Sequence, residues 1–188
     1  MEFILASTSP RRRELLGLIV PQFSCEAPQF DESSICIKNA KQKALTLSRE
    51  KCKDVASRIA DDDKVIIASD TVVDLDGSVM EKPADVEDAF NMISSLSGRR
   101  HRVHTAVTVW CRGVMYSFAD TTDVYVDNIP QDVIWEYVHT DEPYDEAGGY
   151  AIQGFMAGYI SRINGNYHNV VGLPVARLNR LLKIIKAL

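Results

Sequence analysis

The sequence lacks the features that mark several large classes of protein. Its longest apolar run falls well short of the roughly 20 residues that cross a bilayer, and no basic stretch precedes an apolar segment at its start, as in a signal peptide. The four cysteines, Cys25, Cys36, Cys52 and Cys111, form no C-x-x-C pair. Without an export signal, reduced and mostly packed thiols are favoured over disulfides. We therefore expect a cytoplasmic chain that does not enter a membrane.

Positive charge is also scarce. The chain has 21 Lys and Arg against 26 Asp and Glu, a net charge of −5. A broad surface for nucleic acid normally needs a basic domain, so nucleic acid is not an expected partner. The basic segment 99–102 is interpreted as the solvated start of a strand, with nucleic-acid binding as the minor alternative.

What the sequence does have is typical of one globular domain. Its 188 residues are 46% hydrophobic, and no repeat, linker or low-complexity tract divides them. Hydrophobic periodicity and turn residues predict intermixed helices and strands, which favours a mixed α/β or α+β fold for a single domain over residues 1–188. The predicted strands are 3–6, 65–68, 72–75, 78–80, 101–110, 114–126 and 159–163, and the predicted helices are 10–16, 39–59, 86–97, 130–138 and one beginning at 174.

The segment Ser7-Thr8-Ser9-Pro10-Arg11-Arg12 carries the first candidate site. Hydroxyl residues lead from a predicted strand into a helix with Ser9 as N-cap, which places free backbone N–H groups and arginines at one spot. This chemistry suits a polyphosphate. A capped helix with a solvated basic face is the alternative, and the Walker pattern is absent.

Asp70 follows the predicted strand Val65 to Ala68 directly. A carboxylate at the carboxyl end of a buried strand can bind a metal or activate water, although it can also cap the next turn. Asp31 and Glu32 offer further oxygen ligands. Lys82, stiffened by Pro83, can direct a point charge at an anion, or it is an ordinary surface lysine.

The segment Gly148 to Gly154 combines glycines with Tyr150 and Gln153. Glycines allow close approach of the backbone to a ligand, and an amide can read a base edge as donor and acceptor. A tight turn at a sheet edge is the competing interpretation. His101 and His104, three apart in a predicted strand, point to opposite faces and make a poor metal pair.

Taken in order, these segments resemble the Maf family of nucleotide pyrophosphatases, which is related in fold to inosine triphosphate pyrophosphatases. The resemblance implies a long mixed twisted sheet flanked by helices, with a central cleft. The matching segments are Ala6–Arg12, Asp31–Glu32, Ala40–Ala44, Ala68–Val73, Glu81–Pro83, Leu96–Arg99, Gly149–Gly154 and Asn169–Pro174.

The resemblance also implies an activity, hydrolysis of a nucleoside triphosphate between the α- and β-phosphates. The form of the Gly149–Gly154 segment resembles the branch that acts on dTTP and UTP in the house-cleaning of nucleotide pools. A divalent cation, Mg²⁺ or Mn²⁺, and a homodimer are expected with it. A non-catalytic nucleotide-binding regulator of cell division and a 7-methyl-GTP pyrophosphatase are the alternatives.

Residue roles follow from the same resemblance. Asp70 would accept the proton of the attacking water, with Glu32 and Lys82 as further catalytic residues, and Glu32 and Asp70 would ligate the metal. The residues implied in substrate binding are Ser7, Arg11, Arg12, Lys43, Thr71 and Gln153. Among these, Arg11, Thr71 and Gln153 are linked to substrate choice, and Arg11, Arg12 and Lys82 are expected to hold the leaving pyrophosphate.

Overall fold

One mixed sheet of seven strands forms the frame of the protein. The computed structural model describes residues 1–59, 61 and 63–187. The strand order is β2-β1-β3-β5-β6-β7, with β4 beside β3; β1, β2 and β3 are parallel, and the other pairings are antiparallel. The strands are β1 (Glu2–Ala6), β2 (Ser24–Cys25), β3 (Lys64–Leu75), β4 (Ser78–Met80), β5 (Arg100–Cys111), β6 (Val114–Val126) and β7 (Ile160–Asn164).

Helices cover both faces of this sheet. The α-helices are α1 (Pro10–Gly17), α2 (Ala40–Ile59), α3 (Val86–Leu96), α4 (Gln131–Tyr137), α5 (Tyr167–Val171) and α6 (Val175–Ala187). Single 3₁₀ turns lie at η1 (Glu32–Ser34), η2 (Glu142–Asp145), η3 (Ala147–Gly149) and η4 (Phe155–Gly158). None of the described helices combines the length and apolar composition needed to span a bilayer.

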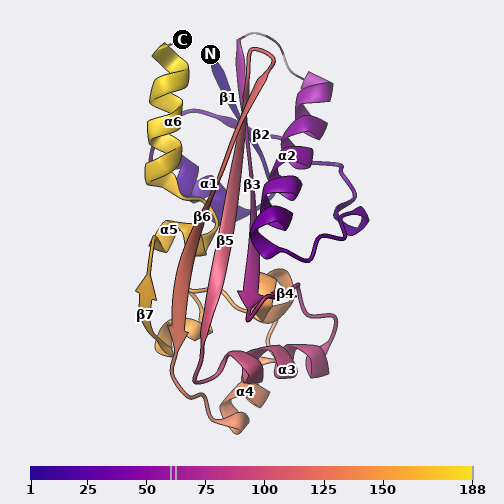
Figure 1. Cartoon of the computed structure of the whole chain (residues 1–188), viewed down its shortest axis with the longest axis vertical. Helices are drawn as coiled ribbons and strands as arrows, with labels where there is room; N and C mark the ends of the chain where they lie inside the picture. Colours follow the sequence, from indigo (N-terminus) through magenta and orange to yellow (C-terminus); the bar gives the residue numbers. More distant parts are fainter. Residues whose placement is uncertain (60, 62, 188) are drawn as a thin grey trace.

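The two faces of the sheet are packed by different helices. On one face Cys52 and Val55 of α2 pack against Ile66 and Ala68 of β3. On the other, α1 and α6 contribute to the largest apolar cluster, which includes Ile67. Figure 1 shows α2 and α6 on opposite sides of the long strands. Successive residues of β3 therefore face different helices, as expected for a strand buried on both sides.

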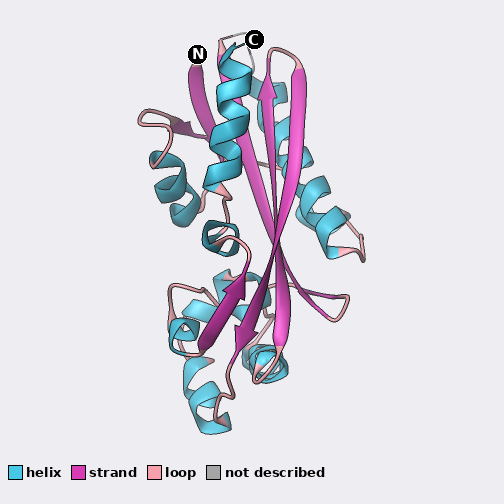
Figure 2. Cartoon of the chain, turned by 60° about the vertical axis from the view of Figure 1, so that its left-hand side comes forward, coloured by secondary structure: helices cyan, strands magenta, loops and turns pink. Residues whose placement is uncertain are grey.

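The long strands β3, β5 and β6 run through most of the length of the molecule. Their upper parts lie between α2 and α6, near both chain ends, and their lower parts lie beside α3, α4 and the short turns (Figures 1 and 2). These strands give the protein an elongated shape with one continuous frame, so a site along β3 can draw residues from both ends.

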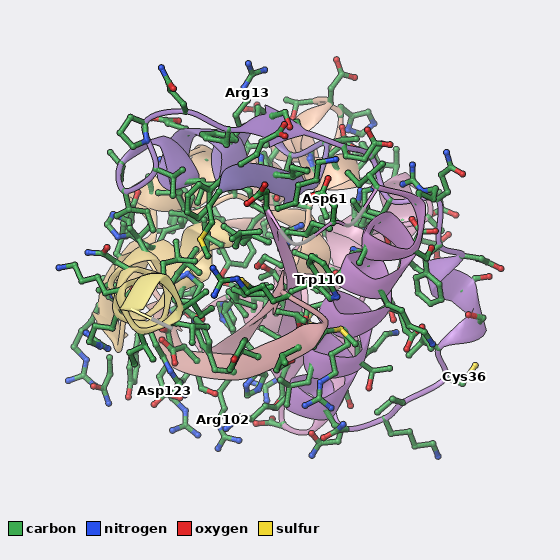
Figure 3. All side chains as sticks on the ribbon, turned by 90° about the horizontal axis from the view of Figure 1, so that it is seen from above. Arg13, Cys36, Asp61, Arg102, Trp110 and Asp123 are labelled. Carbon is green, nitrogen blue, oxygen red and sulfur yellow. The ribbon has the colours of Figure 1, made fainter. Side chains whose placement is uncertain are left out.

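Most predicted elements are confirmed. Ser9 and Asp85 cap α1 and α3 as predicted. The predicted hairpin turn joins β3 to β4 through Asp76 and Gly77, both with positive φ, as a two-residue turn between strands requires. The cysteines are free thiols, but only Cys52 and Cys111 are packed; Cys25 and Cys36 are exposed, and Figure 3 shows Cys36 on an outer loop.

The prediction was wrong about the middle of β3. We expected a strand ending at Ala68 and a second one starting at Val72, whereas β3 continues unbroken through Asp70. The strand is held there by β5, which pairs with it from Val65 to Asp74. The short helix α5, where a simple turn was expected, was also missed.

Asp70 therefore lies beside a gap in the sheet and not at the end of a strand. On the edge of β3 opposite β5, β1 pairs as far as Ala68 and β4 begins to pair at Val73. Residues 69–72 have no strand partner on that edge. Side chains and ligands from either face of the sheet can meet in this gap.

Candidate active site

A cavity of about 710 Å³ opens at the gap between β1 and β4. Its walls come from the turn between β1 and α1, from α2, β3 and α5, and from the segment 145–153. It brings together eight of the residues predicted from the sequence, namely Ser7, Arg11, Arg12, Glu32, Asp70, Thr71, Lys82 and Gln153. Segments far apart in the chain thus converge on one cavity.

Lys43 is the predicted site residue that does not line this cavity. It lines a neighbouring cavity of about 790 Å³ and forms an ion pair with Glu81. Glu32 and Glu81 line both cavities. Lys43 is therefore placed to hold β4 to α2 at the border of the site.

Lys51 lies between two carboxylates, the buried one of Asp70 and that of Glu32, whose side chain is 55% exposed. The Nζ atom of Lys51 lies 2.6 Å from Asp70 Oδ1 and 3.0 Å from Glu32 Oε2. Asp70 is 5% exposed and Lys51 8% exposed, so both charges are removed from water. Two carboxylates here share one ammonium group, and the cluster carries one excess negative charge.

The fold explains why these side chains meet. Asp70 points from β3 to the same face as Ala68, where α2 packs, and Lys51 lies on the inner stripe of that helix. Glu32 comes from the turn η1, which Asp31 caps by accepting a hydrogen bond from Ser33 N.

Burial raises the pKa of Asp70 above its usual value. The nearby charges of Lys51 and Arg12 act in the opposite direction and favour the ionised form. A carboxylate with a raised pKa holds a proton more strongly than an ordinary aspartate does. This property suits a group that takes a proton from water.

Arg12 reaches into the cavity from the other face of the sheet. Its Nε donates to Gly172 O at 3.2 Å and its Nη2 donates to Thr71 Oγ1 at 3.3 Å. Burial lowers the pKa of Arg12, and the charges of Asp70 and Glu32 oppose that shift. Among the described residues, no carboxylate lies at ion-pair distance from Arg12. A partly buried guanidinium without a direct acidic partner favours binding of an anion such as phosphate.

The neighbouring Arg11 has different partners. Both of its terminal nitrogens contact the carboxylate of Glu146, with Nη2 2.8 Å from Oε2. Lys82 is more exposed and lies 3.6 Å from Asp145 Oδ1. From the sequence, Arg11, Arg12 and Lys82 were all expected to hold the leaving pyrophosphate. In the structure, Arg11 and Lys82 each contact a carboxylate and Arg12 contacts neutral oxygens.

The glycine-rich segment 148–154 is fastened to the rest of the fold by buried hydrogen bonds. Gly148 N donates to Glu81 O at 2.9 Å, and the hydroxyl of Tyr137 donates to Gly149 O at 2.9 Å. The hydroxyl of Tyr150 lies 2.5 Å from Nε2 of His101. Gln153 is exposed at the cavity, and its side-chain amide has no hydrogen-bond partner among the described residues, so it can contact a ligand.

The two strand histidines have separate partners. His101 bonds to Tyr150, and burial lowers its pKa to about 4, so it is neutral at pH 7. His104 bonds instead to Thr121 and lies close to Asp74. Each histidine therefore serves the packing of its own face of β5.

The basic segment 99–102 is neutralised by acids. Arg99 pairs with Asp76, and Arg102 lies 3.7 Å from Asp123; Figure 3 shows Arg102 and Asp123 on the same side of the molecule. These pairs leave no concentrated positive surface in the segment, which agrees with the interpretation of a solvated strand.

Sequence reasoning missed Lys51 and Glu146. Lys51 was not singled out, although it lies eleven positions after Ala40, a spacing that falls on the same helical stripe. Glu146 precedes the glycine-rich segment by two positions, and no local pattern marks it as a partner of Arg11.

The acidic residues of the cavity do not form a complete metal cage. In the part of the chain that the structure describes, no group of three or more His, Cys, Asp or Glu side chains could hold an ion. Glu32 and Asp70 do present oxygens to one point, where the Lys51 ammonium lies. Two carboxylates fit a magnesium ion that also takes oxygens from a phosphate ligand and water.

Comparison with known proteins gives consistent matches over the whole chain. A family model described as Maf-like protein matches residues 2–185. A protein of Carboxydothermus hydrogenoformans named dTTP/UTP pyrophosphatase is 44% identical over 185 residues, 97% of this chain and 98% of that protein. A protein of the same name from Vibrio cholerae is 41% identical over 181 residues, 96% of each chain.

A solved structure supports the fold independently. The Ham1 protein of Staphylococcus aureus matches with a TM-score of 0.52 and 15% identity, covering 97% of this chain and 98% of that one. At this identity the match concerns the arrangement of strands and helices alone.

Proposed function

The chain belongs to the Maf family, and on that premise we propose that it is a nucleoside triphosphate pyrophosphatase acting on dTTP and UTP. It cleaves the bond between the α- and β-phosphates and releases a nucleoside monophosphate and pyrophosphate. The observation that carries the proposal is the meeting of Asp70, Lys51 and Glu32 in one cavity with Arg12, which has no carboxylate at ion-pair distance among the described residues.

Arg12, Ser7 and Lys82 bind the phosphates in this proposal. Arg12 offers a partly buried positive charge, Ser7 lies in the turn that leads into α1, and Lys82 adds an exposed charge at the rim. Neutralising the polyphosphate lowers its repulsion of an attacking oxygen and stabilises the charge that develops on the leaving pyrophosphate. Thr71 accepts a hydrogen bond from Arg12 and so orients it.

Asp70 acts as the general base. Its carboxylate takes a proton from the attacking water, and its raised pKa makes it a stronger acceptor than an ordinary aspartate. Lys51 keeps this carboxylate ionised and in place through its contact with Oδ1.

Glu32 and Asp70 would hold the divalent cation, Mg²⁺ or Mn²⁺. When bound with the nucleotide, the cation supplies positive charge to the phosphate oxygens. Lys51 already occupies the point between Asp70 Oδ1 and Glu32 Oε2, so the cation would take the other carboxylate oxygens of the two residues together with phosphate oxygens.

Gln153 is the candidate reader of the base. Uracil and thymine present a ring N–H between two carbonyl oxygens, and an amide offers both an acceptor and donors to that edge. The unpaired side chain of Gln153 and the names of the relatives support a preference for these bases. The homodimer and the cytoplasmic location remain predictions from the sequence.

The alternatives are less favoured. A regulator that only binds nucleotides would not need Asp70, Lys51 and Glu32 together beside Arg12. The relatives reported above are named for dTTP and UTP and not for 7-methyl-GTP.

Product analysis with an Asp70→Asn variant tests the proposal. The protein with Mg²⁺ should convert dTTP and UTP to monophosphate and pyrophosphate faster than 7-methyl-GTP. Asp70→Asn should lower turnover by about 100-fold or more, the scale for a positioned base. As a control, Asp120→Asn alters an aspartate of β6 that pairs with Arg177, and it should leave turnover unchanged.

The products distinguish the alternatives as well. Release of orthophosphate and a diphosphate would contradict the proposed bond cleavage. Consumption of no more than one dTTP per protein molecule would favour a binding regulator.

A further inference from the structure

Arg11 and Arg12 are adjacent in α1 yet differ in their direct contacts. Arg12 donates only to neutral oxygens, those of Gly172 and Thr71, whereas Arg11 meets a carboxylate. Both side chains line the same cavity. The difference between them depends on one residue, Glu146.

Glu146 is placed to hold Arg11 firmly. The two carboxylate oxygens face the two terminal nitrogens of the guanidinium, and this arrangement fixes the orientation of the carboxylate plane and of the guanidinium plane. The Glu146 side chain is 14% exposed and that of Arg11 32% exposed, so water competes only partly for the pair. Burial raises the pKa of Glu146, and Arg11 opposes that shift.

The pair changes what Arg11 can recognise. A guanidinium whose charge is balanced by a carboxylate attracts a polyphosphate much less than a free one does. Its remaining N–H groups still donate in fixed directions, and the carboxylate still accepts. Such a surface suits the uncharged edge of a base, and Gln153 lines the same cavity.

We infer that Glu146 is a specificity-determining residue, which keeps Arg11 out of the phosphate site and fixes it as part of the surface that reads the pyrimidine base. The inference rests on the proposed function for its substrate, a uracil or thymine nucleotide. It assigns the leaving pyrophosphate to Arg12 and not to Arg11.

The substitution Glu146→Gln tests both halves of the inference. It keeps the shape of the side chain and removes the charge that balances Arg11. Pyrophosphate binding, measured by calorimetry with Mg²⁺, should become about 5- to 10-fold tighter, the size of one added charge-assisted contact. The ratio of kcat/KM for UTP over CTP should fall by about tenfold, because these bases differ only in the edge that is read.

Asp145→Asn is the matched control. It removes the same charge from the adjacent residue, which lines the same cavity but is 92% exposed and pairs only loosely with Lys82. It should change the pyrophosphate affinity and the UTP/CTP ratio by less than about twofold, since exposed pairs contribute little. An equal shift in both variants would reduce the effect to overall charge and overturn the inference.

The double variant Arg11→Met/Glu146→Gln gives a second, charge-balanced test. It should bind pyrophosphate within about twofold of the wild-type protein but lose the preference for UTP, whereas Arg12→Met should weaken pyrophosphate binding by at least about tenfold. Loss of pyrophosphate binding in the double variant would place Arg11 in the phosphate site and refute the inference.

The two measurements also separate this inference from the proposed function. If the wild-type protein hydrolyses no nucleotide, the proposed function fails, and the calorimetric comparison still decides whether Glu146 withholds Arg11 from an anion. If hydrolysis occurs and Glu146→Gln leaves both readouts unchanged, the inference alone is wrong.

Discussion

Lys51 is a charged side chain buried on the inner face of α2, and its position has a direct chemical consequence. Its ammonium is the nearest positive charge to Asp70, and its effect on the pKa of that carboxyl is the largest of those opposing burial. Without it, Asp70 would be buried near the like charge of Glu32. Both conditions favour protonation.

Replacing Lys51 by Met should therefore raise the pKa of Asp70 further. Below this pKa the base is protonated and inactive, so the acidic limb of the pH profile of kcat/KM should move to higher pH. Lys51→Arg keeps a positive charge near Asp70, so the acidic limb of the profile should move less in this variant. Steady-state rates between about pH 4 and 8 measure this.

Lys53→Met is the control for this experiment. Lys53 belongs to the same helix, but its side chain is 66% exposed and pairs only with Glu50, one turn away. Its loss should not move the profile. An acidic limb that stays in place in Lys51→Met would show that Lys51 does not govern the protonation of Asp70.

For single residues, the sequence predicts which side chains can bind phosphate or a base better than it predicts which side chains will contact one another. Asp70, Arg12 and Gln153 were found because their types and neighbours suit phosphate and base recognition, and the cavity contains them. Lys51 was missed because residue type does not distinguish a buried lysine from an exposed one, although helical spacing places it on the buried stripe. Its burial depends on acids from two other segments, and no local pattern contains that information.

At the scale of elements, the segment 148–154 owes its position to contacts with distant strands and turns. Glu142 holds its far end, because Oε1 accepts a hydrogen bond from Phe155 N at 3.1 Å and also lies 3.1 Å from the Tyr137 hydroxyl. A Cβ atom on Gly154 would overlap this carboxylate. The glycine therefore serves close packing and not a special backbone angle, since its φ is −102°.

Gly154→Ala should push Glu142 aside and shift Gln153, the residue next to it. We expect kcat/KM for UTP to fall by about tenfold or more, because a small displacement of a positioning group is costly. Gly158→Ala is the matched control, since no atom lies within 4 Å of the added Cβ and its φ is not positive. Equal kinetics for both variants would show that Glu142 does not position the segment.

The elements themselves were largely predictable, and the gap between β1 and β4 was not. Alternating or continuous apolar residues, caps and turn residues define most helices and strands locally. Asp70 was read as the end of a strand because a buried carboxylate is rare in a strand interior. Pairing with β5 carries β3 through that position, and pairing between distant strands has no local signature.

At the scale of the whole molecule, β5 joins the two ends of the protein and carries His101 in its lower part. His101 is 2% exposed, and its Nδ1 atom has no hydrogen-bond partner in the structure. The ring is packed edge-on against Tyr150, whose hydroxyl it contacts through Nε2. A charged ring in this place would have no acid to balance it, so protonation must act against folding.

The stability of the whole protein should therefore fall on acidification in a way that depends on His101. Burial lowers its pKa to about 4, below the 6.5 of an ordinary histidine, so the unfolded chain binds the proton first as the pH decreases. The stabilisation is complete above pH 6.5 and is lost between pH 6.5 and 4, by roughly 3 kcal/mol in the free energy of unfolding. His101→Gln should be less stable than the wild-type protein at pH 7. Between pH 6.5 and 4, however, its free energy of unfolding, measured by urea titration, should fall by roughly 3 kcal/mol less than that of the wild type. His139→Gln, which alters an exposed histidine, should follow the wild-type slope, and parallel slopes for wild type and His101→Gln would contradict the argument.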